Sequence, residues 1–461
     1  MIAMKRNQRD LTNGPLLSGI IVYTVPIILT SVLQLLFNAA DLVVVGRFRG
    51  SLAVGAVGAT GSITNLIVNL FVGLSIGAGV SVAHAIGAKQ EKMLHRTIHT
   101  AVFVALAGGA FLTVIGVTMS GTFLRMMDTP AEILPLASQY MRIYFCGMIF
   151  NLVYNFSAAI LRAAGDTKSP LLFLSIAGVL NVVLNFFFVV VCGMSVAGVA
   201  LATIIAQGVS AFLVVRALMR RTDGCRLDFR QLKIHKAQLL RILRIGVPAG
   251  IQGSLFAISN VIIQSSINSF GDIVVSGNAA AANIEGFVYV AMNAFSQTAV
   301  NYTGQNVGAN RFDRVRKIAL LCILCVAATG MLMGGAIYLF ARPLLGIYIT
   351  DSPEAILYGI TRMSFVGLPY FLCGMMDVAT GSLRGLGSSL TPMVISVLGV
   401  CGIRLGWIFT IFRDPRFHSL ESLFISYPIS WTITFLIEMT AFFIIYRRRA
   451  KQVIPPLHSI L

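Results

Sequence analysis

The sequence predicts an all-α integral membrane protein with twelve transmembrane helices, arranged as two parallel six-helix repeats. Of its 461 residues, 57% are hydrophobic and only 11% are charged, and its mean hydropathy is +0.85. In soluble proteins about a quarter of the residues are charged. The chain also contains repeated apolar runs of about 20 residues, the length that spans the hydrocarbon core of a bilayer. Composition and run length together indicate a multi-pass membrane protein.

A tandem duplication accounts for the order of the apolar runs. The sequence LRAAGDTKSP at 161–170 returns as LRGLGSSLTP at 383–392, so leucine, arginine, glycine and proline recur at an offset of 222 residues. Such internal similarity is the signature of a repeat. Four further landmarks keep offsets of 220 to 223 in the same order: Val25-Pro26 with Val247-Pro248, Gly87-Ala88 with Gly308-Ala309, Asp128-Thr129-Pro130 with Asp351-Ser352-Pro353, and Arg142 with Arg362.

Six apolar segments fall in each half of the chain. Because six is even, both halves start on the same side of the membrane, and the repeats are parallel. We expect an N-terminal lobe over 1–215, a basic cytoplasmic linker over 216–244 and a C-terminal lobe over 245–461. The predicted segments are 16–45, 52–83, 96–120, 133–161, 170–191, 196–218, 245–269, 274–306, 318–341, 355–382, 392–412 and 422–446.

The distribution of basic residues predicts the orientation. With the N-terminus inside, 26 of the 35 lysine and arginine residues fall in cytoplasmic segments and only 6 in the opposite loops. This bias places both termini in the cytoplasm. The net charge of +18 then reflects this bias and an affinity for anionic lipid headgroups, and not nucleic-acid binding. The first apolar run is too long for a signal peptide and lacks a cleavage site, so we expect it to remain as a helix.

The sequence contains no motif typical of an enzyme or a metal centre. The seven cysteines are scattered, and the CxxC at Cys322 and Cys325 lies in an apolar helix, so we interpret it as core packing. No GxxxxGK[ST] loop occurs, and no cofactor or resident metal is expected. The linker 216–244 has two interpretations: a basic tether, which we favour, or an amphipathic interfacial helix over 232–243.

Four acidic residues lie inside apolar segments, namely Asp41, Glu285, Asp377 and Glu438. A charged side chain at the bilayer centre costs roughly 2.5–3.5 kcal/mol or more, so each is a candidate functional group that faces protein or water. Glu285 and Asp377 are open to functional and structural interpretations alike. For Glu438, on the last helix, we favour a structural role.

Asp41 has polar companions at helical spacing. Gln34, Asn38 and Asp41 lie on one face of the first predicted helix. The fifth predicted helix carries Asn181 and Asn185 on a similar stripe with Gly178, and the sixth carries Thr203. A carboxylate among amides and a hydroxyl can hold a proton or coordinate a bare cation through oxygen ligands. The alternative is a structural carboxyl near the membrane interface.

The two halves differ at these positions. At the 222-residue offset Asp41 corresponds to Ile263, Asn181 to Ile403 and Asn185 to Trp407. The first-half cluster was therefore not copied, which argues against a purely structural role. The second half has a polar set of its own, which we interpret as a second cation site or the wall of a cavity: Asn260, Gln264, Glu285 and Asp377, with Asn155 as the first-half counterpart of Asp377.

The combined pattern resembles the multidrug and toxic compound extrusion (MATE) transporters over nearly the whole chain. The features that carry the resemblance are the two six-helix lobes, the basic linker, the paired signatures at 161–166 and 383–387, the Gly-Ala turns at 87–88 and 308–309, Asp41 followed by Val45-Gly46, and the pair Asn181 and Asn185. The resemblance implies a V-shaped pair of lobes that open alternately to the two sides of a prokaryotic inner membrane.

The resemblance further implies an antiporter that exports lipophilic or cationic organic compounds against an inward flow of H+ or Na+. The coupling carboxylate of the prokaryotic branch matches Asp41, and its polar helpers match Gln34, Asn181 and Thr203. Where that branch commonly has a second acid, this sequence has Asn185. Another branch has a glutamate on the seventh helix, where this sequence has only Asn260 and Gln264. We expect a monomer whose partners are small organic substrates, the coupling cation and membrane lipid.

Two other functions stay open. A flippase for lipids or lipid-linked oligosaccharides of the same superfamily would need a cationic central cavity. Only Arg142, Arg362 and Arg404 lie within apolar segments, which disfavours this alternative. A receptor or structural membrane protein without turnover is the other.

Overall fold

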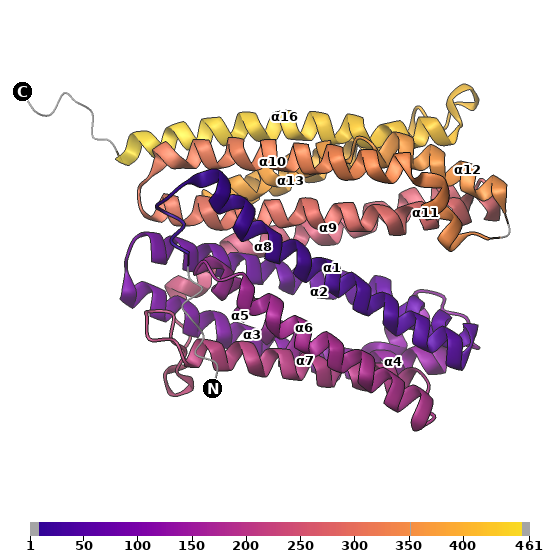
Figure 1. Ribbon diagram of the computed structural model, residues 1–461, viewed down its shortest axis with the longest axis horizontal. Helices are drawn as coiled ribbons and strands as arrows, with labels where there is room; N and C mark the ends of the chain where they lie inside the picture. Colours follow the sequence, from indigo (N-terminus) through magenta and orange to yellow (C-terminus); the bar gives the residue numbers. More distant parts are fainter. Residues whose placement is uncertain (1–8, 351, 454–461) are drawn as a thin grey trace, which may run out of the picture. The chain divides into compact units, whose positions relative to one another are not determined.

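The computed structural model describes residues 9–350 and 352–453, and this part of the chain is helical with no strand (Figure 1). The all-α prediction is therefore confirmed. The outermost residues of both termini, which we predict to be cytoplasmic, and Asp351 of one repeated landmark lie outside the described residues.

The helices pack into two compact units. The first contains Val25–Gly250 together with the short segment that ends at Asp10. Within it α5 packs against α3 and α7, and α6 packs against α7 (Figure 1). Its elements are most of α1 (Leu16–Arg49), α2 (Ser51–Gly87), α3 (Glu91–Met126), α4 (Leu134–Cys146), α5 (Met148–Ala163), α6 (Lys168–Asn185), the π-helix η1 (Phe186–Val191), α7 (Val196–Met219), the 3-10 turn η2 (Phe229–Gln231) and the start of α8 (Lys236–Asn268).

The second unit contains Leu11–Thr24 and the chain from Ile251 onward. Here α9, α10 and α13 pack together, and α13 also packs against α16. Its further elements are α9 (Asp272–Gly308), α10 (Phe312–Leu339), α11 (Ala341–Tyr348), α12 (Pro353–Arg362), the π-helix η3 (Met363–Gly367), α13 (Tyr370–Gly385), α14 (Leu390–Ser396), the π-helix η4 (Val397–Gly402), α15 (Ile403–Phe409), the 3-10 turn η5 (Pro415–Phe417) and α16 (Leu420–Val453).

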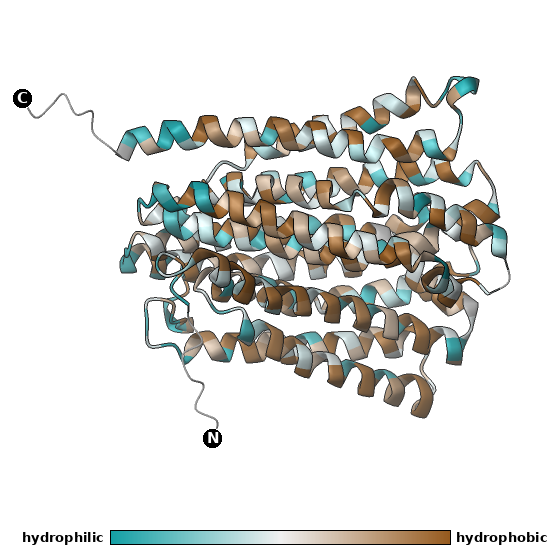
Figure 2. Cartoon of the chain, turned by 45° about the horizontal axis from the view of Figure 1, so that its top comes forward, coloured by the Kyte–Doolittle hydropathy of each residue, from teal (hydrophilic) through white to brown (hydrophobic). Residues whose placement is uncertain are grey.

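The number of membrane-spanning segments agrees with the sequence prediction. In the described part of the chain, eleven helical stretches are long and apolar enough to cross a membrane. The pair α4 and α5, bent by 48° at Gly147, makes a twelfth span. Apolar residues occupy the middle of the helices, whereas hydrophilic residues gather near their ends and in the connections (Figure 2). This is the pattern that a bilayer imposes.

The first helix of each repeat changes unit next to a proline. Helix α1 contains Pro26 and belongs to the second unit up to Thr24, whereas α8 contains Pro248 and belongs to the first unit up to Gly250. Proline removes an intrahelical hydrogen bond and weakens the helix locally. The two packed units therefore divide inside these helices. The division at 1–215, 216–244 and 245–461 concerns repeats in the sequence and stays a prediction.

The repeated signatures form the same turn in both halves. Gly165 and Gly387 have φ angles of 85° and 82°, in the left-handed region that glycine tolerates best. The Gly-Ala turns repeat as well, with Lys89 at φ 52° and Asn310 at φ 56°. At Gly165 a β-carbon would also overlap the carbonyl of Arg9. The backbone thus supports the duplication at residue level.

The linker 216–244 is neither a loose tether nor a separate interfacial helix. From Lys236 it is already the beginning of α8, so most of the proposed interfacial helix is part of a spanning helix. The residues before it lie against α3: Nε2 of the buried His99 lies 3.1 Å from the backbone nitrogen of Asp228, and the amide of His235 donates to Thr100. Both sequence interpretations are only partly correct.

A close helix crossing joins α2 to the beginning of α8 within the first unit. Gly73 and Gly77 of α2 face Gly246 and Gly250 of α8, and a β-carbon at either α2 position would overlap the α8 backbone. Small residues four apart allow such contact between helices in lipid. This crossing fixes the first turns of α8 to the first unit.

We predict that Gly77→Leu lowers the apparent melting temperature of the purified protein by several degrees, because overpacking a tight contact costs about 1–3 kcal/mol. The measurement is thermal unfolding in detergent. Gly58→Leu is the matched control, since Gly58 of the same helix has no atom within 4 Å of the added β-carbon. Equal melting temperatures for the two variants would contradict the importance of the crossing.

Candidate functional site

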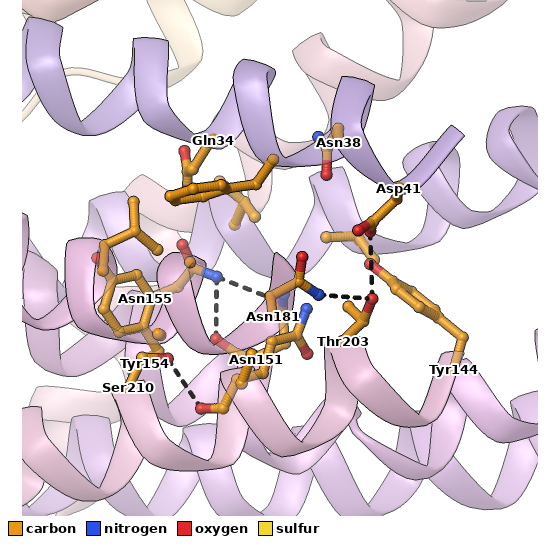
Figure 3. A pocket seen from close by; sticks show the side chains of 18 of the residues that line it. Gln34, Asn38, Asp41, Tyr144, Asn151, Tyr154, Asn155, Asn181, Thr203 and Ser210 are labelled. Atoms are coloured by element: carbon orange, nitrogen blue, oxygen red, sulfur yellow. Dashed lines mark hydrogen bonds between the residues drawn. The ribbon is translucent and has the colours of Figure 1, made fainter. Parts of the chain in front are cut away.

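A polar cavity of about 410 Å³ lies inside the first unit, among α1, α2, α4, α5, α6 and α7 (Figure 3). Asp41 is the only charged residue in its lining. The other polar side chains are amides, hydroxyls and phenols: Gln34, Asn38, Asn65, Tyr144, Asn151, Tyr154, Asn155, Asn181, Thr203, Gln207 and Ser210. A volume in this range is typical of small-molecule sites.

The Asp41 carboxylate accepts hydrogen bonds from two other helices. Nδ2 of Asn185 in α6 donates to Oδ1 at 2.5 Å, and Oγ1 of Thr203 in α7 lies 3.3 Å from Oδ2. Asn181 joins them, because its Oδ1 accepts from Asn185 at 3.2 Å and its Nδ2 lies 3.5 Å from the Thr203 hydroxyl. Figure 3 shows Asp41, Thr203 and Asn181 directed toward one another. Three helices thus meet at one carboxylate.

Close packing of α1 on α6 brings these residues together. Gly178 lies where a β-carbon would overlap the ring of Phe37, so the two helices approach closely at this level. Asp41 is one turn beyond Phe37, and Asn181 and Asn185 follow Gly178 on the same face of α6. Helix α6 ends at Asn185 and continues as the π-helix η1. Such π-helical turns occur frequently at functional sites.

One acceptor oxygen of the site has no donor. Oδ1 of Asn185 is buried and makes no hydrogen bond with any described residue. Asp41 itself is partly buried and forms no ion pair with a basic residue in the described part of the chain. A carboxylate and an unpaired amide oxygen in a membrane interior favour a bound cation or a proton.

The structure therefore brings together the first-half residues that the sequence singled out. Gln34, Asp41, Asn181 and Thr203 line the cavity, and Asn185 bonds directly to Asp41. Asp41 points toward the fifth predicted helix. An Asp41 that pointed away from that helix would have refuted the predicted cluster. Their roles in ion coupling stay a prediction.

One residue was grouped wrongly, and several were missed. Asn155, assigned with the second-half candidates through its counterpart Asp377, lines the first-unit cavity and donates to Oδ1 of Asn151 at 3.1 Å. Asn65, Asn151 and Gln207 were not selected, although each is an amide inside an apolar segment. The signal was their helical spacing: 151 with 155 on α5, and 203 with 207 and 210 on α7.

The second-half candidates do not form one cation site. Glu285 and Arg362 are buried and form an ion pair, with Nη2 of Arg362 2.8 Å from Oε2 of Glu285. Arg362 also donates to Asn278 at 2.7 Å, and Asn278 donates to Gln264 at 3.2 Å. The positive charge of Arg362 thus already neutralises Glu285, which favours the structural interpretation of that acid.

The remaining second-half candidates lie apart from this ion pair. Asn260 is exposed on α8. Asp377 is partly buried on α13, and its carboxylate makes no hydrogen bond with the described residues, although its backbone carbonyl accepts from Ser296 at 2.6 Å. The residues predicted as one set therefore occupy separate environments.

Comparison with known families identifies the fold. The profile of the MatE family matches the chain twice, over residues 26–187 and 248–409. The matches begin at the equivalent prolines of the two repeats and together cover more than half of the chain. This chain belongs to the MatE family.

Bacterial relatives extend the MatE similarity over almost the full length. The chain is 27% identical over 427 residues to the "Probable multidrug resistance protein YoeA" of Bacillus subtilis, covering 90% of this chain and 91% of the relative. It is 28% identical over 443 residues to "Probable multidrug resistance protein YpnP" of the same organism, covering 95% and 96%. The "Probable multidrug resistance protein NorM" of Thermotoga maritima is 26% identical, with 83% of each chain covered.

Solved MATE structures share the fold. One described as the "Outward-facing conformation of a multidrug resistance MATE family transporter of the MOP superfamily" superposes with a TM-score of 0.89 at 20% identity, covering 96% of this chain and 98% of that one. Another, a "MOP superfamily transporter from Pyrococcus furiosus", gives 0.88 with the same identity and coverage. The two-repeat fold prediction is confirmed.

We predict that the Glu285–Arg362 pair stabilises this MatE protein as a unit. Glu285→Gln or Arg362→Met alone leaves an uncompensated buried charge and should cost about 3–5 kcal/mol. The double replacement removes both charges and should recover much of that loss. Apparent melting temperatures in detergent measure the effect, with Glu354→Gln, an exposed acid of α12, as the control. A double variant no more stable than either single variant would contradict the pairing.

Proposed function

We propose that this protein is a cation-coupled antiporter that exports lipophilic or cationic organic compounds by alternating access. Its coupling ion is H+ or Na+, bound at Asp41. The protein works as a monomer in a prokaryotic inner membrane, with both termini in the cytoplasm and membrane lipid around its spans. It performs no chemical conversion and has no resident cofactor or metal.

One observation carries this proposal: Asp41 lies in a polar cavity inside a membrane-spanning unit with no basic partner among the described residues. A lone carboxylate in such a place is costly when charged. The carboxylate with a bound proton or small cation is therefore lower in free energy than the empty carboxylate. An organic cation that enters the same cavity competes for the same charge, which is the physical basis of exchange.

The neighbours of Asp41 suit a site that alternates between loaded and unloaded states. In the unloaded state the Asn185 amide and the Thr203 hydroxyl donate to the carboxylate. In the loaded state the free Oδ1 of Asn185 supplies an acceptor for a proton, after rotation of the amide, or a ligand for Na+. Asp41 therefore has hydrogen-bonding or ligand partners in both states without a large rearrangement of α6 or α7.

Helix α1 connects this site to a conformational change. Asp41 lies on the part of α1 that belongs to the first unit, and Pro26 lies just beyond the point at which α1 leaves the second unit. We propose that ion binding at Asp41 changes the packing of α1 on α6 and bends the helix near Pro26. A single charge that crosses the membrane provides about 2.3 kcal/mol per 100 mV, enough for a modest substrate gradient.

Substrates of this kind agree with the cavity and with the relatives. Amides and phenols around one carboxylate can bind many small organic cations without a fixed pattern of donors and acceptors. Relatives that align with nearly all of this chain carry the names "multidrug resistance protein" and "Multidrug export protein". These names support export of organic compounds as the general activity.

A flippase for lipid-linked anions is the second candidate, and the cavity disfavours it. No lysine or arginine lines the cavity. Arg142 is exposed on α4, Arg362 pairs with Glu285, and Arg404 donates to Ser430 beneath the ring of Tyr427. Arg362 and Arg404 are thus engaged away from the cavity, Arg142 is exposed, and a pyrophosphate in the cavity would meet a carboxylate.

We predict that Asp41→Asn abolishes uphill export while the protein still inserts and folds. The measurement is transport of a fluorescent organic cation into proteoliposomes, with pH and sodium gradients imposed separately. The gradient that drives the wild-type protein identifies the coupling ion. Asp272→Asn, an exposed acid at the start of α9, should transport normally. Full gradient-driven export by Asp41→Asn would refute the assignment.

A further inference from the structure

Glu438 is a second acid that the proposed mechanism does not use. It lies in the middle of α16 in the second unit, and its side chain is fully buried. The other buried glutamate of this unit, Glu285, is neutralised by Arg362. No lysine or arginine forms an ion pair with Glu438 in the described part of the chain. A carboxylate in this position has to be neutralised by something else.

Among the described residues, every hydrogen-bond partner of Glu438 is a hydroxyl. Oγ1 of Thr380 in α13 lies 2.9 Å from both carboxylate oxygens, and Oγ of Ser396 at the end of α14 lies 2.6 Å from Oε1. Both hydroxyls are themselves buried. A hydroxyl can donate to a carboxylate or, after rotation, accept from a carboxylic acid. The cage therefore serves the charged and the neutral form alike, which backbone amides could not do.

Thr434 carries a third buried hydroxyl near this acid along α16, and Thr380, Ser396 and Thr434 together are called the hydroxyl cage. Thr434 is one turn before Glu438 on the same face of α16, and its Oγ1 makes no hydrogen bond with any described residue. Gly399 of the π-helix η4 packs against this hydroxyl, so closely that a β-carbon would overlap it. A buried hydroxyl without a partner is costly, and a side-chain rotation that let it accept the proton of a neutral Glu438 would remove that cost.

The number of oxygens around Glu438 favours a proton over a metal ion as the ligand. Contacts of 2.6 and 2.9 Å between the carboxylate and its hydroxyl partners are direct hydrogen bonds. Hard cations such as Ca2+ and Mg2+ take about six or more oxygen ligands, whereas the hydrogen-bond partners of Glu438 among the described residues supply only two hydroxyl oxygens beside the carboxylate. A proton needs only one acceptor besides the acid.

The charged groups that act on Glu438 lie on one neighbouring helix. Asp377 and Arg384 of α13 both influence it electrostatically, and together with Thr380 they occupy one face of that helix. From α14, Glu438 receives only the hydroxyl of Ser396, which is uncharged. The Cys401 thiol of η4 points to the carbonyl of Leu255 and not to Glu438. Asp377 is only partly buried, so the face of α13 that carries Thr380 also carries a partly exposed acid.

We propose that Glu438 in its hydroxyl cage is a second proton-binding site of this transporter, separate from Asp41 and located in the other unit. Loading gives the neutral acid, with its proton donated to a hydroxyl of the cage. Release leaves the carboxylate, stabilised by Thr380 and Ser396, and passes one proton to the half-buried side of α13. This inference rests on the proposed function in its proton-coupled form.

The test combines infrared spectroscopy with transport stoichiometry. The C=O stretch of a protonated carboxyl is followed in membranes while the pH is raised, and protons per substrate are obtained by balancing a pH gradient against a substrate gradient. We expect Glu438→Gln to lose one titrating carboxyl band and one proton per substrate. Glu421→Gln, an exposed acid of the same helix, should leave the buried carboxyl bands and the stoichiometry unchanged.

Two results would overturn the inference. Identical carboxyl bands in the wild type and in Glu438→Gln would mean that Glu438 holds no titrating proton. A lost band with unchanged protons per substrate would make Glu438 a structural acid. If Glu438→Gln does not fold, Thr380→Val and Ser396→Ala replace it. Losing a donor to the carboxylate should keep Glu438 protonated, and its carboxyl band present, to higher pH. A band that disappears at the same pH as in the wild type overturns the inference.

The same data separate this inference from the proposed function. Loss of gradient-driven export in Asp41→Asn supports the function whatever Glu438 does. Conversely, wild-type export driven by sodium alone would remove the proton-coupled form of the function, and the inference with it. A third outcome is that Asp41→Asn still exports while Glu438→Gln loses one proton per substrate. This would refute the Asp41 assignment and leave Glu438 as a proton site.

Discussion

A membrane interior tolerates a carboxylate only when something neutralises it, and this constraint governs the polar architecture of the protein. Asp41, Glu285 and Glu438 meet it in three ways. Glu285 has a guanidinium at 2.8 Å. Glu438 has only hydroxyls, and Asp41 has an amide, a hydroxyl and a cavity. Acids without a basic partner are those that an exchangeable ion can neutralise, which connects burial to ion coupling.

The surrounding helices serve this arrangement. Glycine at 178 lets α1 approach α6, so that Asp41 reaches Asn185. Next to a proline, α1 and α8 each pass from one packed unit to the other. The carboxylate and the weakened helical turn therefore lie on the same helix. A change in charge at Asp41 can alter the packing of α1 without a separate signalling element.

The fold was largely readable from the sequence, because a bilayer imposes length and hydropathy on every span and because the duplication repeats at 222 residues. The Asp41 cluster was also readable, since amides at helical spacing inside apolar runs are rare. The second-half set was not. Nothing in the sequence distinguishes Glu285, whose partner Arg362 is 77 residues away, from Glu438, whose partners are hydroxyls on two other helices. Asn155 was misgrouped because equivalence between repeats does not preserve the environment of a side chain.

The central claim is that one carboxylate serves ion and substrate in turn, and binding to the purified protein tests it most directly. The affinity for an organic cation is measured by equilibrium binding across a range of pH and of sodium concentration. The account predicts that protons or Na+ weaken substrate binding in the wild type, and that replacing the Asp41 carboxylate by an amide removes this competition. Competition that persists undiminished without the carboxylate would contradict the account.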